Sequence, residues 1–278
     1  MRSSVEIFNI DTRQNRVLFQ TDLLIEAPNW TPDGATLLVN GDGGLFRLSI
    51  DNPVSLSPVD LGFATEINND HGISADGRQI VISDKTEYGK SCIYVLPAAG
   101  GVPRQVTAHL PSYWHGWSPD GLTLAYCGIR GDEFDIYTIP VEGGEEHRLT
   151  FAEGRNDGPD YSPCGSWIYF NSSRTGLMQI WRMRVDGSGL ERLTADGFGD
   201  WFPHPSPRGD KVLLISYDAD VFDHPRDKAV RMRLMDPDGG NLETLFELFG
   251  GQGSINVPNW SPDGSQFAYV RYFPVEAS

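Results

Sequence analysis

Short runs that alternate between apolar and polar residues recur along the whole chain, and a tight turn sequence precedes many of them. The runs at residues 79–82 (Gln-Ile-Val-Ile) and 122–127 (Leu-Thr-Leu-Ala-Tyr-Cys) are typical. Alternation with a period of two predicts half-buried β-strands. No stretch repeats apolar residues at helical spacing for long enough to predict a helix. The expected fold class is therefore all-β.

The turn sequence itself recurs six times, most clearly as Asn-Trp-Thr-Pro-Asp-Gly at residues 29–34 and Asn-Trp-Ser-Pro-Asp-Gly at residues 259–264. Proline fixes φ, aspartate bonds to its own backbone and glycine adopts a positive φ, so the motif predicts a hairpin turn. Five copies share a serine that we expect to stabilise the turn, because the elbow sequence around a hydrolase nucleophile is absent. These serines are Ser74, Ser118, Ser162, Ser206 and Ser261.

The spacing of the turns reveals a repeat architecture. Their closing glycines stand at positions 34, 77, 121, 165, 209 and 264, so the steps are 43, 44, 44, 44 and 55 residues. Each repeat contains four short strand-like runs joined by Gly-rich turns, which is the pattern of one propeller blade. We therefore predict a single six-bladed β-propeller domain over residues 1–278, with four antiparallel strands in each blade.

The two ends of the chain are expected to complete one blade together. After Gly264 the sequence has room for one further strand, at residues 266–271. At the other end, residues 5–10 and 16–19 form a strand pair with no preceding turn motif. Pairing the ends closes the ring and removes exposed sheet edges, so the last blade should combine both termini.

The charge and cysteine content restrict the partners and the compartment. With 38 acidic and 22 basic residues the net charge is −16, which opposes binding to nucleic acid or to anionic lipid. No apolar run reaches membrane-spanning length, and the N-terminal residues lack a signal-peptide pattern. We expect a cytoplasmic monomer, with the periplasm as the alternative if a signal peptide has been removed. The three cysteines, Cys92, Cys127 and Cys164, are expected to be structural.

One repeat carries a recognisable family pattern. It reads Asn-Asp-Gly-Pro-Asp-Tyr-Ser-Pro at residues 156–163, Ile-Tyr-Phe-Asn-Ser-Ser-Arg at residues 168–174 and Asp-Gly-Ser at residues 186–188, and it closes on Leu193 and Thr194. This pattern resembles the repeat of TolB-type six-bladed propellers, and the likeness extends over essentially the whole chain. The resemblance implies a ring with a central channel and a binding face.

Prolines and histidines share one position of the repeat, six residues before the turn glycine. Proline cannot donate to a β-ladder, so this strand needs an unpaired side, and we assign it to the innermost strand facing the channel. The residues are Pro28, His71, His115, Pro159, Pro203 and Pro258. Two positions later the residues are mostly large and flat, and we expect them to pack between neighbouring blades.

The residues that begin each inner strand are unusually polar, which predicts a polar mouth at one end of the channel. They could line a water-filled channel, bind a small molecule or peptide, or hold a divalent metal ion. The metal ligands would be His71, His115 and His204. The candidate ligand-binding residues are Asn69, Asp70, His71, Trp114, His115, Asp157, Asp160, Asp200, Trp201 and His204.

Two functions fit these features. The first is a non-enzymatic binding module without catalytic residues or a cofactor, which presents the channel mouth to a protein, peptide or small polar ligand. The alternative is a metal-dependent lyase or hydrolase acting on an acidic or sugar substrate, because some propellers with this type of ring resemble oligogalacturonate lyases, which hold a metal by channel histidines. Against the lyase, Arg155 is the sole basic residue near the candidate histidines in sequence. The acid-rich insert at residues 217–228 is expected to be a solvated loop.

Overall fold

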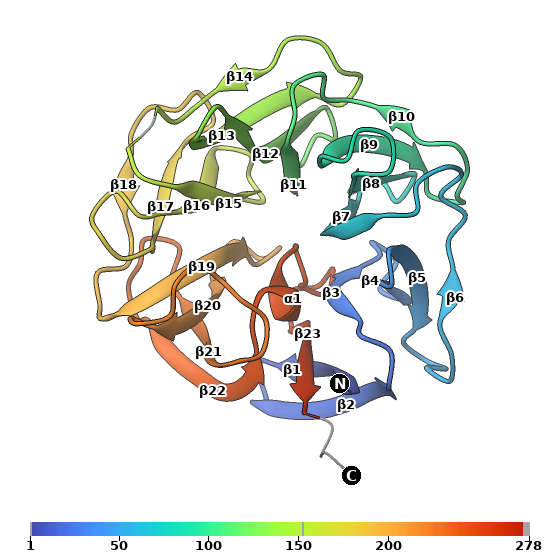
Figure 1. The fold of residues 1–278 in the computed structure, drawn as a ribbon. Helices are drawn as coiled ribbons and strands as arrows, with labels where there is room; N and C mark the ends of the chain where they lie inside the picture. Colours follow the sequence, from blue (N-terminus) through green and yellow to red (C-terminus); the bar gives the residue numbers. More distant parts are fainter. Residues whose placement is uncertain (1, 152, 275–278) are drawn as a thin grey trace.

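Six β-sheets surround a central axis like the blades of a propeller in the computed structural model, which describes residues 2–151 and 153–274 (Figure 1). Five sheets contain four antiparallel strands and follow one another along the chain. The first consists of β3 (Glu26–Trp30), β4 (Thr36–Gly41), β5 (Gly44–Ser49) and β6 (Ser57–Pro58); the second of β7 (Ile67–Ile73), β8 (Gln79–Asp84), β9 (Cys92–Pro97) and β10 (Arg104–Gln105).

The next three blades repeat this order of strands. The third consists of β11 (Ser112–Trp117), β12 (Thr123–Arg130), β13 (Glu133–Pro140) and β14 (His147–Arg148). The fourth consists of β15 (Asn156–Tyr161), β16 (Trp167–Ser172), β17 (Gln179–Arg184) and β18 (Glu191–Arg192). The fifth consists of β19 (Phe198–Pro205), β20 (Val212–Asp218), β21 (Lys228–Met235) and β22 (Glu243–Gly250). The predicted six-bladed, all-β architecture is confirmed.

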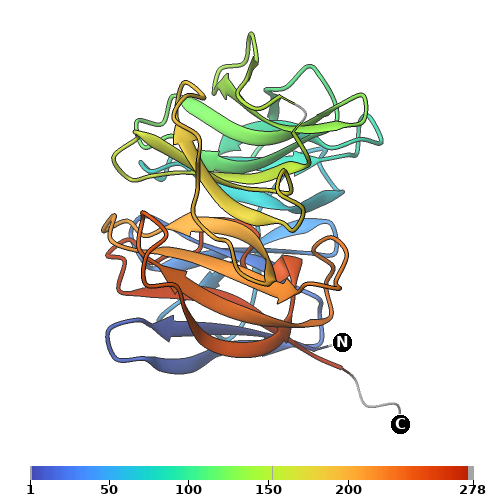
Figure 2. The ribbon, with the colours of Figure 1, turned by 90° about the vertical axis from the view of Figure 1, so that its left-hand side faces the viewer.

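Both ends of the chain build the sixth blade, as the sequence predicts. The N-terminal strands β1 (Arg2–Asn9) and β2 (Gln14–Thr21) pair with each other, and β1 also pairs with the C-terminal strand β23 (Gln266–Phe273) along its full length. Figure 2 shows these strands together at one edge of the ring. A single bridge between Trp260 and Phe267 takes the place of the innermost strand. One helical turn, α1 (Gln252–Ile255), precedes it.

The recurrent serine stabilises its turn through two hydrogen bonds. In the third copy the Ser118 hydroxyl donates to Asp120 Oδ1 at 2.6 Å and accepts from the Thr123 amide at 2.9 Å. The closing glycine, Gly121, has φ = +75°, and its amide donates to the Ser118 carbonyl at 2.8 Å. This geometry confirms that the serine belongs to the turn.

Each innermost strand of the five complete blades has one hydrogen-bonded neighbour and therefore a free edge toward the axis. Every one of these strands also contains a register shift, between residues 26 and 29, 67 and 71, 114 and 116, 157 and 160, and 201 and 204. A bulge bends a strand and redirects the side chains around it. The shifts coincide with the shared proline and histidine position, so they decide which side chains reach the axis.

The large residues four positions before each turn glycine pack between blades, as predicted. Trp30 of the first blade, for example, shares a core cluster with Ala268 and Val270 of the sixth. Cys92 and Cys127 are buried, Cys164 is exposed, and all three are free thiols. No helix among residues 2–151 and 153–274 is long and apolar enough to cross a membrane.

Candidate functional site

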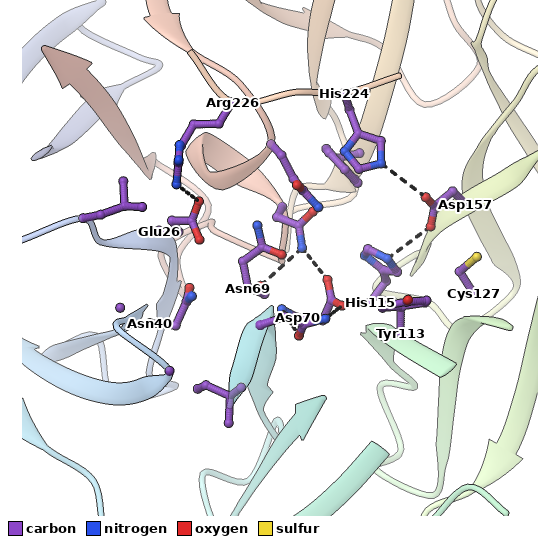
Figure 3. A pocket seen from close by; sticks show the side chains of 18 of the residues that line it. Glu26, Asn40, Asn69, Asp70, Tyr113, His115, Cys127, Asp157, His224 and Arg226 are labelled. Atoms are coloured by element: carbon purple, nitrogen blue, oxygen red, sulfur yellow. Dashed lines mark hydrogen bonds and ion pairs between the residues drawn. The ribbon is translucent and has the colours of Figure 1, made fainter. Parts of the chain in front are cut away.

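A cavity of about 560 Å³ opens where the inner strands begin, and all six blades contribute to it. We call it the polar mouth. Its walls are set by one position of the repeat, eight residues before the turn glycine, which places Glu26, Asn69, Tyr113 and Asp157 around the axis (Figure 3). Asn256 occupies the same repeat position and also lines the cavity. The fifth blade supplies Phe202 and His224 instead. The lining also includes Asn40, Asp70, His115, Cys127, Arg155, Arg226 and Gln252.

One side of the polar mouth, the paired half, holds charges that neutralise one another. Asp157 lies at its centre, with His115 Nε2 at 3.3 Å from Oδ1, and Arg155 and His224 at 3.7 and 3.8 Å from Oδ2. Arg155 also binds Asp223 at 2.9 Å, and its guanidinium lies over the ring of Phe134. In Figure 3 the dashed lines from Asp157 run to the two histidines.

The pKa shifts in the paired half follow from these contacts. Burial alone would raise the pKa of Asp157, but the hydrogen bond from His115 and the surrounding positive charges hold it well below its ordinary value. Burial alone would lower the pKa of His115, but Asp157 and the charge of Asp70 raise it. Burial lowers the pKa of His224. Asp157 is therefore ionised and neutralised by its own neighbours at neutral pH.

The opposite side, the acidic half, consists of Glu26, Asn40, Asp70 and Asn256. Asp70 is buried and accepts hydrogen bonds from the amides of Asn256 and Asn68, each at 2.6 Å, but no ion pair reaches it from the described residues. Burial raises the pKa of Asp70 to about 6. Burial also raises the pKa of Glu26, whose cationic neighbour is Arg226 at 3.9 Å. These carboxylates carry charge that the protein does not fully neutralise.

The insert between β20 and β21 carries His224 and Arg226 to the polar mouth, although residues 218–220 of the insert are exposed, as expected of a solvated loop. His224 packs edge-on against Trp201, with ring centroids 4.4 Å apart, and the Pro225 carbonyl accepts from the Tyr217 hydroxyl at 3.2 Å. These contacts bring His224 and Arg226 over the polar mouth. Phe222 of the same insert is 90% exposed.

The structure places four of the predicted site residues in the polar mouth, namely Asn69, Asp70, His115 and Asp157. The others lie elsewhere. Trp114 is buried against Gly72, Asp200 bonds to Ser216 at 2.6 Å, and Trp201 lines a neighbouring apolar groove.

The three histidines proposed as metal ligands have separate surroundings. His71 is fully buried beside the backbone of Leu38 and Ala27, and burial lowers its pKa to about 4. His204 Nδ1 lies 3.0 Å from Asp160 Oδ2, and its Nε2 lies 2.6 Å from the Ile255 carbonyl oxygen. No group of three or more His, Cys, Asp or Glu side chains among the described residues could hold a metal ion. Contrary to the expected ligand set, His71, His115 and His204 have different neighbours and do not form one ligand group among the described residues.

Sequence reasoning missed several residues of the polar mouth. Glu26 and Asn256 occupy the same repeat position as Asn69 and Asp157, so counting back eight residues in every repeat would have found them. Asn40, His224 and Arg226 carry no such periodic signal.

Two further cavities lie outside the polar mouth. The opposite end of the channel holds one of about 300 Å³, lined by Trp30, Trp117, Tyr161 and Trp260 together with turn prolines. An apolar groove of about 630 Å³ lies beside the polar mouth and shares Phe134 and Arg155 with it.

Ring and mouth together define a six-bladed β-propeller with a polar cavity to which every blade contributes. Residues 111–224 match the model of the TolB β-propeller domain. The chain is 68% identical over 276 residues to an uncharacterized protein of Agrobacterium fabrum, covering 99% of this chain and 94% of that protein. A solved structure described as a putative TolB from Agrobacterium tumefaciens superposes with a TM-score of 0.98 at 68% identity, covering 99% of both chains. The chain belongs to the TolB-like β-propeller family.

More distant relatives differ in length. TolB of the Tol-Pal system of Francisella tularensis is 26% identical over 261 residues, covering 88% of this chain and 56% of that protein, so the chain spans about half its length. An oligogalacturonate lyase in complex with manganese shares the fold with a TM-score of 0.61 at 16% identity, covering 90% of this chain and 75% of that one.

Proposed function

We propose that this protein is a non-catalytic binding module that takes a protein segment, a peptide or a small polar ligand into the polar mouth. The observation that carries the proposal is the cavity to which all six blades contribute polar side chains. Concave sites with a few convergent polar groups are the usual form of a ligand pocket. Among these ligands, family favours a protein partner, since the Francisella tularensis relative is by name a protein of the Tol-Pal system.

The side chains of the polar mouth are poorly suited to catalysis. Cys127 is the thiol in its wall, and burial raises the pKa of this group well above its ordinary value, so it stays protonated and weakly nucleophilic. The His115 ring is bound to Asp157, which argues for a structural ion pair rather than a free general base. Binding therefore accounts for these residues better than acid–base or nucleophilic chemistry.

The lyase alternative is disfavoured by charge. A polygalacturonate chain carries one carboxylate per sugar, but the polar mouth already contains Glu26, Asp70 and Asp157. Its guanidinium groups are Arg155 and Arg226, and Arg155 is held by Asp223. An acidic cavity repels an anionic substrate. Sharing the fold with a lyase does not transfer the activity.

Ligand-observed NMR with a mixture of small polar fragments and short peptides tests the proposal. Gln252→Trp places a bulky ring at the edge of the polar mouth, and Gln14→Trp makes the same change on an exposed strand end. We expect ligands to bind the wild type and Gln14→Trp and to lose binding in Gln252→Trp, with no new signals from a product. Binding that ignores Gln252→Trp, or conversion of a fragment, would contradict the proposal.

A separate activity assay tests the lyase alternative directly. Oligogalacturonate incubated with the protein and manganese should yield no unsaturated product by ultraviolet absorbance. The monomeric state and the cytoplasmic compartment stay predictions.

A further inference from the structure

We infer that the acidic half of the polar mouth recognises a cationic group of the ligand, an ammonium or a guanidinium, such as a lysine or arginine side chain. This inference rests on the proposed function, because it names the chemistry that the same cavity selects.

The acidic half is rich in hydrogen-bond acceptors. Asp70 and Glu26 supply carboxylate oxygens, and Asn40 and Asn256 each hold a buried side-chain oxygen without a hydrogen-bond partner among the described residues. Buried acceptors without partners cost free energy, and a ligand that brings donors removes that cost. An ammonium brings three donors and a guanidinium five, and neither has an acceptor.

The distribution of charge favours the same ligand. In the paired half His115, Arg155 and His224 already surround Asp157, so a cation gains little there. In the acidic half Asp70 has no ion-pair partner from the described residues, and the charge that acts on it, that of His115, is already paired with Asp157. A ligand cation beside Asp70 therefore gains more there. Charge-assisted hydrogen bonds to a carboxylate are stronger than neutral ones.

Arg226 is the protein's own cation at the edge of the acidic half. Its NH1 is 3.9 Å from Glu26, its Nε lies 3.4 Å from Asp227, and its side chain is 39% exposed. These are long, partly solvated contacts, which are weak. A ligand cation can therefore compete with Arg226 for Glu26.

Binding of a cation should depend on pH in a defined direction. Asp70 is faced by Glu26 from β3, by Tyr113 and His115 from β11 and by Asp157 from β15. Its carboxyl has a pKa of about 6, so part of the population must lose a proton before it can bind a cation. Affinity should rise as pH increases through about 6, because a cation binds the ionised form.

Isothermal titration calorimetry with three blocked tripeptides tests the inference. The probes are acetyl-Gly-Lys-Gly-amide, acetyl-Gly-Gln-Gly-amide and acetyl-Gly-Glu-Gly-amide, which differ only in the central side chain: cationic, neutral or anionic. We expect the lysine peptide to bind most tightly at pH 7.5 and to weaken by about tenfold at pH 5.

Variants assign the effect to the acidic half. Asp70→Asn should weaken the lysine peptide by about tenfold or more, and Glu26→Gln by a smaller factor. Arg226→Gln removes the internal competitor and should strengthen binding. The matched control is Asp51→Asn, which removes one charge from an exposed loop and should leave the affinity unchanged. Near-ultraviolet circular dichroism verifies that each variant is folded.

The possible failures are distinguishable. If the glutamate peptide binds as tightly as the lysine peptide, or if Asp70→Asn and Glu26→Gln both leave the affinity unchanged, the cationic preference is wrong although the polar mouth still binds ligands. If no peptide binds, the cationic inference is also wrong, and the fragment experiment decides whether the polar mouth is a binding site at all.

Discussion

A carboxylate buried without an ion-pair partner, like that of Asp70, costs stability at neutral pH. Its pKa of about 6 in the folded chain exceeds the value of an unfolded aspartate. Between about pH 4 and 6 the folded chain binds a proton that the unfolded chain releases, so this contribution to the free energy of unfolding falls as pH rises through that window.

Asp70→Asn isolates this contribution. We expect the free energy of unfolding of the wild type, relative to the variant, to fall by about 2 kcal/mol between pH 4 and pH 7. Urea unfolding of both proteins across that range measures the difference. A difference that stays constant with pH would show that Asp70 is not destabilised by burial.

The pKa values of two histidines at the same repeat position should be shifted in opposite directions. His71 is buried without an acidic partner among the described residues, and burial lowers its pKa to about 4, whereas Asp157 raises the pKa of His115. NMR titration of the imidazole rings measures both values. Adding manganese or zinc should shift neither ring, since the two do not belong to one ligand group; a common shift of both would restore the metal site.

At the scale of the turn, the structure offers a matched pair of serines. Ser118 donates to a carboxylate, but in the fourth repeat Cys164 replaces the aspartate, and Ser162 lies 3.4 Å from that sulfur. Ser118→Ala should cost about 1 kcal/mol of unfolding free energy and Ser162→Ala less, because a thiol is the weaker partner. Chemical denaturation compares the two. A loss of ligand binding without loss of stability in Ser118→Ala would show that the serine acts beyond its turn.

The strands and turns could be predicted because local chemistry determines them: the two-residue alternation at 122–127 and the Pro-Asp-Gly turns need no distant contact. Residues of the polar mouth could be predicted where they share a position of the repeat, as Asn69 and Asp157 do. The bulges that bury His71 and turn His204 toward Asp160 depend on neighbouring blades. The insert that carries His224 belongs to no repeat, so the sequence pattern does not reveal where it lies. Its contacts with Trp201 and Tyr217 hold it over the polar mouth.

At the scale of the whole molecule, the ring depends on its closure by both ends. β1 lies between β2 and β23, so removing the N-terminal strands leaves β23 without its paired neighbour. Deleting residues 1–20 should abolish cooperative thermal unfolding. A synthetic peptide of residues 1–22 added in trans should restore it. A truncated chain that still unfolds cooperatively on its own would contradict this closure.

The central claim is that the polar mouth, and not either of the other two cavities, binds a ligand with a cationic group. A crystal structure of the protein with acetyl-Gly-Lys-Gly-amide tests it most directly. The account predicts the peptide in the polar mouth, with the lysine ammonium within hydrogen-bonding distance of Asp70 or Glu26. A peptide bound instead at the aromatic end of the channel beside Trp30 and Trp117, or in the apolar groove beside Phe222, would contradict it.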